Sequence, residues 1–299
     1  MEIKNILAPF DFYDSSRRAF IYAAALAKRF SAHLTLFHVV TLFDDDPYDP
    51  QFSFPHLDEF YKHLEEQAGG QFEKLIAENQ SAGLNVSYVV QRGFSPYEEI
   101  LRFAEDNPVD LIVMGTHGRT ALSRFFLGSV TAKVVHHAPC PVMTVRMNVK
   151  TPGEPSTPKF KRLLVPTDFT EPSNKALQLA CGLLEEGGTI FLLHVIEGLV
   201  QPAFFAADGE LIYEVTPQIR DNSEALLKQA ASQVPAGIDV QTVTLEGSIA
   251  HEILEYAETQ DIDLIVMGTH GQNALSHLFI GSEANRVIRK ACCPVITVK

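Results

Sequence analysis

Three glycines and a serine in the first half of the chain have the spacing of a phosphate-binding loop. Gly115 and Gly118 are followed, after nine residues, by Gly128 and Ser129, which gives the pattern G-x-x-G-x9-G-S. Glycine lets the backbone approach an oxyanion closely, and free N–H groups at a helix N-terminus supply donors and a favourable dipole. If a helix begins at Ser129, main-chain groups alone can hold a phosphate chain, and a hydroxyl of Ser129 or Thr131 can add a donor.

The same pattern occurs a second time in the other half of the chain. Gly268, Gly271, Gly281 and Ser282 repeat it at identical spacing. A single G-x-x-G is more often a turn at the end of a strand than a ligand site. Duplication of the whole pattern favours the phosphate site, although a duplicated loop can persist in a copy that no longer binds.

Two aspartates and two valines are candidates for holding the nucleoside part of a nucleotide. Asp11 and Asp168 end the first predicted strand of their halves, and Val39 and Val195 lie near the end of the second. A carboxylate there can accept a hydrogen bond from a ribose hydroxyl or an adenine amino group, or it can cap the following helix. The valines can offer backbone N–H and C=O to adenine, but alone such residues more often belong to the core.

The histidines form no catalytic or metal-binding pattern. His38, His117, His194 and His270 accompany no H-x-H or H-E-x-x-H spacing and no triad order. No Walker lysine follows the glycines, and no residue of the motif is an evident base for activating water. We therefore predict no catalytic residue and no metal site in the protein itself, and slow ATP hydrolysis at most.

An internal repeat shows that the chain arose by duplication. Asp110–Gly118 recurs unchanged as Asp263–Gly271, an offset of 153 residues from Gly115 to Gly268 in a chain of 299. Lys150–Pro158 is rich in proline and small polar residues, which is typical of a linker. We expect a first domain over 1–147, a linker over 148–160 and a second domain over 161–299.

Short apolar runs alternate with longer segments of helical period in each half, which is typical of βαβ units. Leu111–Met114 lacks polar alternation, as expected of a strand covered on both faces. We predict an α/β fold with two doubly wound domains, each containing a five-stranded parallel sheet. The strands are expected near 3–9, 33–40, 85–91, 110–115 and 141–146, and near 161–167, 189–196, 238–245, 263–268 and 294–298.

The composition excludes several classes of protein. A formal net charge of −13 opposes non-specific binding to nucleic acid or an anionic membrane. The apolar runs are shorter than the roughly 18 residues of a membrane-spanning helix, and the four cysteines lack metal or redox spacing. With no charged leader after Met1, we expect a cytoplasmic protein.

Four motifs, each present in both halves, resemble the universal stress protein family: P-x-D-F, the H-V of the second strand, M-G-x-x-G-x9-G-S and the closing C-P-V. The resemblance covers essentially the whole chain. It implies sheets of strand order 3-2-1-4-5, pairing between the final strands of the two domains, and ATP or AMP in members with the full glycine motif. It also implies a cytoplasmic role in stress survival without a well-defined reaction.

The resemblance also assigns residues to parts of the ligand, with Asp11 at the adenosine, Val39 at the adenine and the loop at the phosphates. The predicted nucleotide-binding residues are Asp11, Val39, Gly115, Gly118, Arg119, Gly128, Ser129, Val130 and Thr131 in the first copy, and Thr167, Asp168, Val195, Gly268, Gly271, Gly281 and Ser282 in the second. We expect ATP, with AMP or ADP as alternatives, and Mg²⁺ can accompany ATP.

The two copies differ in ways that favour triphosphate binding by the first. Phe10 stands where the second copy has the hydroxyl of Thr167, and Glu283 stands where the first copy has Val130. A carboxylate at that position can occupy the positive end of a helix dipole and repel phosphates. The first loop also carries two arginines, whereas 272–280 contains no Lys or Arg.

Three functions are compatible with these features. The first is a nucleotide-binding stress or regulatory protein, and the second is a slow ATP hydrolase or nucleotidyl-transfer enzyme. The third is an interaction scaffold with empty sites, in which the aromatic residues of the variable segments 41–60 and 197–216 bind a partner or a second copy. Those segments can equally cover the ligand cleft.

Overall fold

The computed structural model describes residues 2–42, 57–79, 83–116, 127–147, 158–197, 216–269 and 281–299. These residues form two compact units, one mainly of Glu2–Met147 and the other mainly of Lys159–Lys299. Most of the two variable segments lies outside the described residues, and so do Gly118, Arg119 and Gly271.

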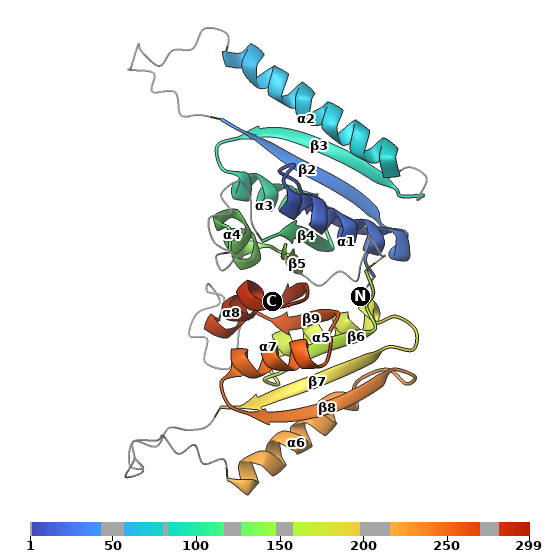
Figure 1. Ribbon diagram of the computed structural model, residues 1–299, viewed down its shortest axis with the longest axis vertical. Helices are drawn as coiled ribbons and strands as arrows, with labels where there is room; N and C mark the ends of the chain where they lie inside the picture. The colour runs from blue at the N-terminus through green and yellow to red at the C-terminus, as the bar shows by residue number, and fades with distance from the viewer. Residues whose placement is uncertain are drawn as a thin grey trace, which may run out of the picture. The chain divides into compact units, whose positions relative to one another are not determined.

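The first unit contains a parallel five-stranded sheet of order β3-β2-β1-β4-β5 (Figure 1). Its elements are β1 (Asn5–Pro9), α1 (Asp14–Phe30), β2 (His33–Thr41), α2 (Leu57–Asn79), β3 (Val86–Gly93), α3 (Pro96–Asp106), β4 (Leu111–Gly115), α4 (Ser129–His137) and β5 (Val142–Val145).

The second unit repeats this architecture, with order β8-β7-β6-β9-β10 (Figure 1). Its elements are β6 (Arg162–Pro166), α5 (Glu171–Leu183), β7 (Thr189–Ile196), α6 (Pro217–Ala231), β8 (Asp239–Glu246), α7 (Ile249–Thr259), β9 (Leu264–Gly268), α8 (Ser282–Lys290) and β10 (Val295–Val298). The predicted fold class, strand order and all ten strand positions are therefore confirmed to within about two residues.

The order of the strands fixes where a ligand can bind. The chain moves outward from β1 to β3, then returns to place β4 on the other side of β1. Because crossovers between parallel strands are right-handed, α1 and α2 cover one face of the sheet, and α3 and α4 cover the other. The crevice between β1 and β4, beyond their carboxyl ends, is the position at which such sheets bind ligands.

Apolar strands make the core of each unit. Leu111–Met114 is buried throughout, and its repeat Leu264–Met267 is buried as well. In α1, the residues that face the sheet recur at three- and four-residue spacing, as the sequence predicted, and include Ala19, Ala23 and Leu26. Covering both faces of each sheet with helices therefore explains the continuous apolar runs.

An aspartate at the head of each repeated nine-residue segment joins two strands. Asp110 Oδ2 accepts hydrogen bonds from the backbone N–H groups of Lys4 and Asn5, at 2.8 and 2.9 Å. Asp263 accepts the equivalent pair at the start of β6, at 2.9 and 2.8 Å. Each carboxylate thereby fixes the start of the first strand beside the start of the fourth.

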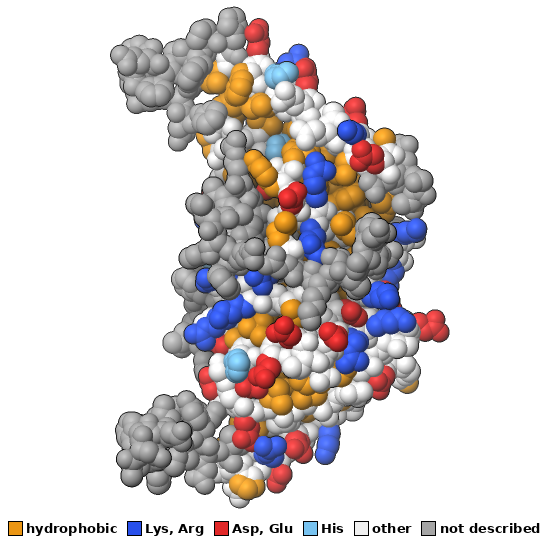
Figure 2. All heavy atoms as spheres, viewed as in Figure 1, with side chains coloured by type: hydrophobic (Ala, Val, Ile, Leu, Met, Phe, Trp, Pro, Cys, Tyr) orange, Lys and Arg blue, Asp and Glu red, His pale blue; other side chains and the backbone are white. Residues whose placement is uncertain are grey.

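On the described part of the face in Figure 2, Lys and Arg side chains lie among Asp and Glu side chains and form no continuous basic stripe. In the same described ranges, no helix has both the length and the apolar character that crossing a bilayer requires.

Candidate functional site

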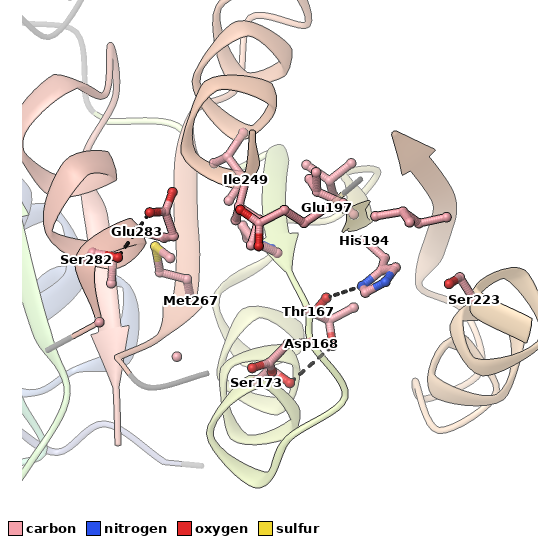
Figure 3. A pocket seen from close by; sticks show the side chains of 18 of the residues that line it. Thr167, Asp168, Ser173, His194, Glu197, Ser223, Ile249, Met267, Ser282 and Glu283 are labelled. Carbon is pink, nitrogen blue, oxygen red and sulfur yellow. Dashed lines mark hydrogen bonds between the residues drawn. The ribbon is translucent and has the colours of Figure 1, made fainter. Parts of the chain in front are cut away.

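A cavity of about 570 Å³ lies at the carboxyl ends of the strands in the second unit (Figure 3). The walls come from the ends of β6, β7 and β9 and from the first turns of α7 and α8, with α6 on the far side. The cavity brings together all six predicted second-copy residues that the structure describes: Thr167, Asp168, Val195, Gly268, Gly281 and Ser282. Its volume suits a ligand the size of a nucleoside or nucleotide.

The helix that follows each glycine loop has a free N-terminal turn. In α4 the first backbone bond within the helix runs from the Ala132 N–H to the Gly128 carbonyl, so the N–H groups of Ser129, Val130 and Thr131 have no acceptor inside the helix. The same bond runs from Asn285 to Gly281 in α8. Both turns can therefore donate to an anion.

Glycine is favoured at different positions of the motif for different physical reasons. A Cβ built on Gly268 would lie 3.0 Å from Pro172 Cβ and 3.2 Å from the Ser173 nitrogen, so a side chain there would require β9 and α5 to move apart by a few tenths of an ångström. At Gly281, however, the nearest described atom would be the Thr269 carbonyl oxygen at 3.4 Å, an ordinary contact. Its φ of −55° suits any residue, which leaves close approach by a ligand as a reason for glycine there.

The aspartates two residues beyond the ends of β1 and β6 shape the turn that follows them. Asp11 Oδ1 accepts the Tyr13 N–H at 3.1 Å, and Asp168 Oδ1 accepts the Thr170 N–H at 3.1 Å. Each is an Asx turn that leads into the next helix, so the capping alternative describes part of their role. Each carboxylate has a second oxygen, and Asp168 lines the cavity.

The register of β2 explains how Val39 can contact a ligand. The Phe10 N–H donates to the Phe37 carbonyl on the β1 side, and the Leu42 N–H donates to the Gly93 carbonyl on the β3 side. Because successive residues of a parallel strand bond alternately to the two neighbours, Val39 directs its N–H and C=O to the β1 side. β1 ends opposite Phe37, so these groups point into the crevice.

Val195 occupies the same register in β7. The Thr167 N–H donates to the Leu193 carbonyl on the β6 side, and the Gly247 N–H donates to the Ile196 carbonyl on the β8 side. The peptide groups of Val195 therefore lie on the β6 side, past the point where β6 ends. Both valines present backbone donors and acceptors to the place predicted for adenine.

The histidines of the second strands hold the turn that follows the first strand. His38 Nδ1–H donates to the Phe10 carbonyl at 2.7 Å, and His194 Nδ1–H donates to the Thr167 carbonyl at 2.8 Å. Burial lowers the pKa of His38. Each ring also lies against the phenylalanine after the aspartate, Phe12 or Phe169, and both of these have a left-handed φ of 66°. The histidine thus stabilises the unusual turn that carries the aspartate.

Two threonines predicted to contact nucleotide use their hydroxyls within the protein. Thr131 is buried, and its hydroxyl donates to the Gly115 carbonyl at 2.8 Å. The Thr167 hydroxyl donates to Ser173 Oγ at 3.1 Å and accepts the Phe169 N–H at 3.1 Å. Thr131 therefore joins α4 to the end of β4, and its backbone N–H remains the group available to a ligand.

The residue that replaces Thr167 in the first unit belongs to an aromatic core. Phe10 is buried and its ring packs against Phe12, Phe20 and Phe72, with centroid distances of 5.3, 6.4 and 5.6 Å. The interior beneath the crevice is thus filled by aromatic rings in the first unit, whereas small polar side chains occupy it in the second.

Glu283 occupies the first turn of α8, as the sequence indicated, but it also binds a second helix. Its Oε2 accepts the Ala250 N–H at the start of α7 at 3.0 Å, and its Oε1 accepts the Ser282 hydroxyl at 3.1 Å and a hydrogen bond from Arg286 at 3.0 Å. The carboxylate lies on the wall of the cavity. The Ser282 hydroxyl donates to this carboxylate and so turns its donor away from a phosphate.

Three residues that line the cavity are not among the predicted contacts. Ser173 belongs to α5, and Ser223 belongs to α6, which follows the variable segment and lies across the cavity from Ser282 and Glu283 (Figure 3). Glu197 directly follows β7 and also lines the cavity. Ser173 repeats Ser16, five residues after the aspartate in each copy, so comparison of the two copies could have found it, whereas Ser223 and Glu197 belong to no repeated motif.

Comparisons with known proteins agree with this architecture. The model of the universal stress protein family matches twice, over residues 2–146 and 159–299. Universal stress protein MJ0531 of Methanocaldococcus jannaschii is 37% identical over 144 residues, which cover 47% of this chain and 82% of that protein. Universal stress protein Slr1230 of Synechocystis is 24% identical over 320 residues, 99% of this chain and 100% of that protein.

Among solved structures, a universal stress protein from Archaeoglobus fulgidus matches 99% of this chain and 98% of its own, with a TM-score of 0.72 and 20% identity. At that identity the likeness concerns the fold. Together with the double match of the family model, it shows that the chain belongs to the universal stress protein family and carries two copies of the family's domain in tandem.

Proposed function

We propose that the first unit binds an adenine nucleotide, ATP in preference to AMP or ADP, with its phosphates at the N-terminus of α4. The protein then acts as a cytoplasmic regulatory protein of the stress response, and hydrolysis of ATP is slow or incidental. Bound ATP stabilises a conformation, or an assembly of two copies, that partners recognise.

The observation that carries this proposal is the difference between the two helices that follow the glycine loops. The first turn of α4 contains no acidic residue, and its free N–H groups lie beside the half-buried side chain of Val130. The first turn of α8 contains Glu283. A helix N-terminus attracts a polyphosphate, and a carboxylate at that terminus opposes it.

Positive charge near α4 supports the same assignment. Lys133, one turn into the helix, lies over the Tyr97 ring with its Nζ 4.1 Å from the centroid. Its counterpart in the second unit is Arg286, which forms an ion pair with Glu283 at 3.0 Å. One turn into α4 the first unit thus carries a lysine over an aromatic ring, whereas the equivalent cation of the second unit is paired with a carboxylate.

The nucleoside is proposed to lie over the carboxyl ends of β1 and β2. There the open peptide groups of Val39 can bond to the edge of adenine, and Asp11 can accept a ribose hydroxyl. Ser129 is exposed, and its hydroxyl is the side-chain donor best placed to add to the backbone groups of α4.

Mass spectrometry of nucleotide released from the full chain, purified without added ligand, tests the proposal. We expect adenine nucleotide at close to one equivalent per chain, and saturable binding of ATP by calorimetry after the nucleotide has been removed. Absence of both released nucleotide and calorimetric binding would contradict the proposal.

A further inference from the structure

The cavity of the second unit has a negative lining. Asp168, Glu197 and Glu283 contribute carboxylates, and among the described residues that line the cavity there is no Lys or Arg. A triphosphate placed here would face carboxylates without a compensating cation, and like charges at such separations repel strongly.

The charge of Glu283 is held in place and remains on the cavity wall. Its hydrogen bond to the Ala250 N–H anchors it between the N-termini of α7 and α8. Arg286, its ion-pair partner, has a side chain that is 60% exposed and does not line the cavity. An exposed pair of this kind is screened by solvent, so the carboxylate remains available to a cation inside.

A hydroxyl on the opposite wall also faces the cavity. Ser223 on α6 is only 7% exposed, it lines the cavity, and no hydrogen bond joins its hydroxyl to another described residue. Figure 3 shows it facing the cavity from the side opposite Ser282 and Glu283. A hydroxyl on a cavity wall can donate to a polar ligand or accept from one.

The remaining walls suit the flat body of a nucleoside. Apolar side chains of Ile196, Ile249, Ile253 and Met267 line the cavity, and Val195 presents its open peptide groups at the same strand end as Val39 does in the first unit. Asp168 repeats the position of Asp11. The two units differ in the protein residue that would lie beside the 5′ end of the ligand.

We propose that the second unit binds a nucleoside whose 5′ position carries a positively charged group, such as an amine or a sulfonium, in place of phosphate. Glu283 contacts the 5′ cation, Asp168 accepts from the ribose, and Ser223 bonds to a polar group at the base end. The choice of a nucleoside as the ligand rests on the function proposed for the first unit, whereas the choice of a positive 5′ group rests on the carboxylates that line this cavity. The tandem chain thus carries two sites of opposite charge preference.

Calorimetry of the full chain with three ligands that differ only at the 5′ carbon tests this inference. The ligands are adenosine, 5′-amino-5′-deoxyadenosine and AMP. We expect the amine to bind at least about tenfold more tightly than adenosine at a site that AMP does not compete for, because one charge pair at close range is worth that much. This advantage should shrink as salt is added.

Two substitutions assign the effect to this cavity. Glu283→Gln keeps the size of the side chain and its acceptor for the Ala250 N–H, and should bring the amine to within about threefold of adenosine. Ser223→Ala removes a hydroxyl that has no described partner, so it should leave the unfolding midpoint unchanged and weaken adenosine and the amine by the same factor, about fivefold.

Equal affinity for amine and adenosine, an amine preference that survives in Glu283→Gln, or displacement of the amine by AMP would overturn the inference. The salt series decides the question without any variant, should Glu283→Gln fail to fold. A parallel titration with ATP keeps the two proposals distinct. ATP binding without amine preference refutes only the second site, and amine preference without ATP binding refutes only the proposed function of the first unit.

Discussion

The backbone of Gly115, at the end of β4, packs directly against Ser15 in the first turn of α1. A Cβ on Gly115 would lie 2.8 Å from the carbonyl carbon of Ser15, closer than real Cβ atoms approach other atoms. The first glycine of the loop motif is therefore required by the packing of α1 on the sheet, whatever binds beyond it.

Gly115→Ala is accordingly predicted to destabilise the first unit by about 1–3 kcal/mol, because the added methyl group forces α1 away from β4. Gly281→Ala is the matched control in the second unit. Its Cβ meets only an ordinary contact at 3.4 Å, so the loss should stay below about 1 kcal/mol, the usual effect of alanine at a helix N-cap. Urea unfolding of both variants measures the difference, and similar losses at the two positions would refute the distinction.

Removal of the carboxylate that joins β1 to β4 should also be costly. Asp110→Ala leaves the N–H groups of Lys4 and Asn5 without their acceptor, and we predict a loss of about 1–3 kcal/mol in the free energy of unfolding. Asp106→Ala is a suitable control because its exposed side chain ends α3. Equal stability of the two variants would show that the Asp110 bonds contribute nothing.

The stability of the first unit should depend on pH through His38. Burial lowers the pKa of its imidazole below 6.5, against the opposing effects of the bond to Phe10 and the charge of Asp11. Between the folded-state pKa and 6.5 the unfolded chain binds more protons, so the stabilisation is present above about pH 6.5 and is lost as the pH falls below it. Thermal unfolding from about pH 7 to about pH 5 should show this loss.

His38→Asn is the variant that isolates this effect, because the asparagine amide can replace the Nδ1–H donor without titrating in this range. The decline of stability with falling pH should be shallower in the variant than in the native chain. An unchanged decline would assign it to other groups.

Much of the fold follows from local patterns. Leu111–Met114 predicted a buried strand because every residue of the run is apolar, and the structure buries all of them. The repeat of this run near residue 264 predicted a second domain of the same architecture. The buried strand and the repeated domain depend on residues adjacent in sequence, so both can be predicted without knowledge of tertiary contacts.

The sequence could not show which side chains already have partners. The Thr131 hydroxyl points to the Gly115 carbonyl, and the Glu283 carboxylate bridges to the N-terminus of α7. These contacts join elements distant in the chain, and only the packing of the helices determines them. Ser223 could not be predicted for another reason, because it lies on a helix that follows a segment whose sequence differs from that of the equivalent segment in the other copy.

The tandem glycine loops therefore have unequal surroundings. The first precedes a helix whose initial turn is free of acidic residues, and the second precedes a helix whose initial turn contains Glu283. Gly118, Arg119 and Gly271 lie outside the described residues, and their assignment to the phosphates stays a prediction. The contrast at the first helical turn is the feature that the structure makes available for a direct test.

Calorimetric titration of ATP into the full chain and into the variants Val130→Glu and Val130→Gln tests the central claim most directly. Val130→Glu copies the second-unit residue into α4. Acidic residues favour a helix N-terminus, so the fold should be preserved, while Val130→Gln controls for size and polarity. We predict that Val130→Glu weakens ATP binding by about tenfold or more through repulsion of the phosphates, with Val130→Gln close to the native chain. Equal affinity of all three proteins for ATP would contradict the placement of phosphates at α4.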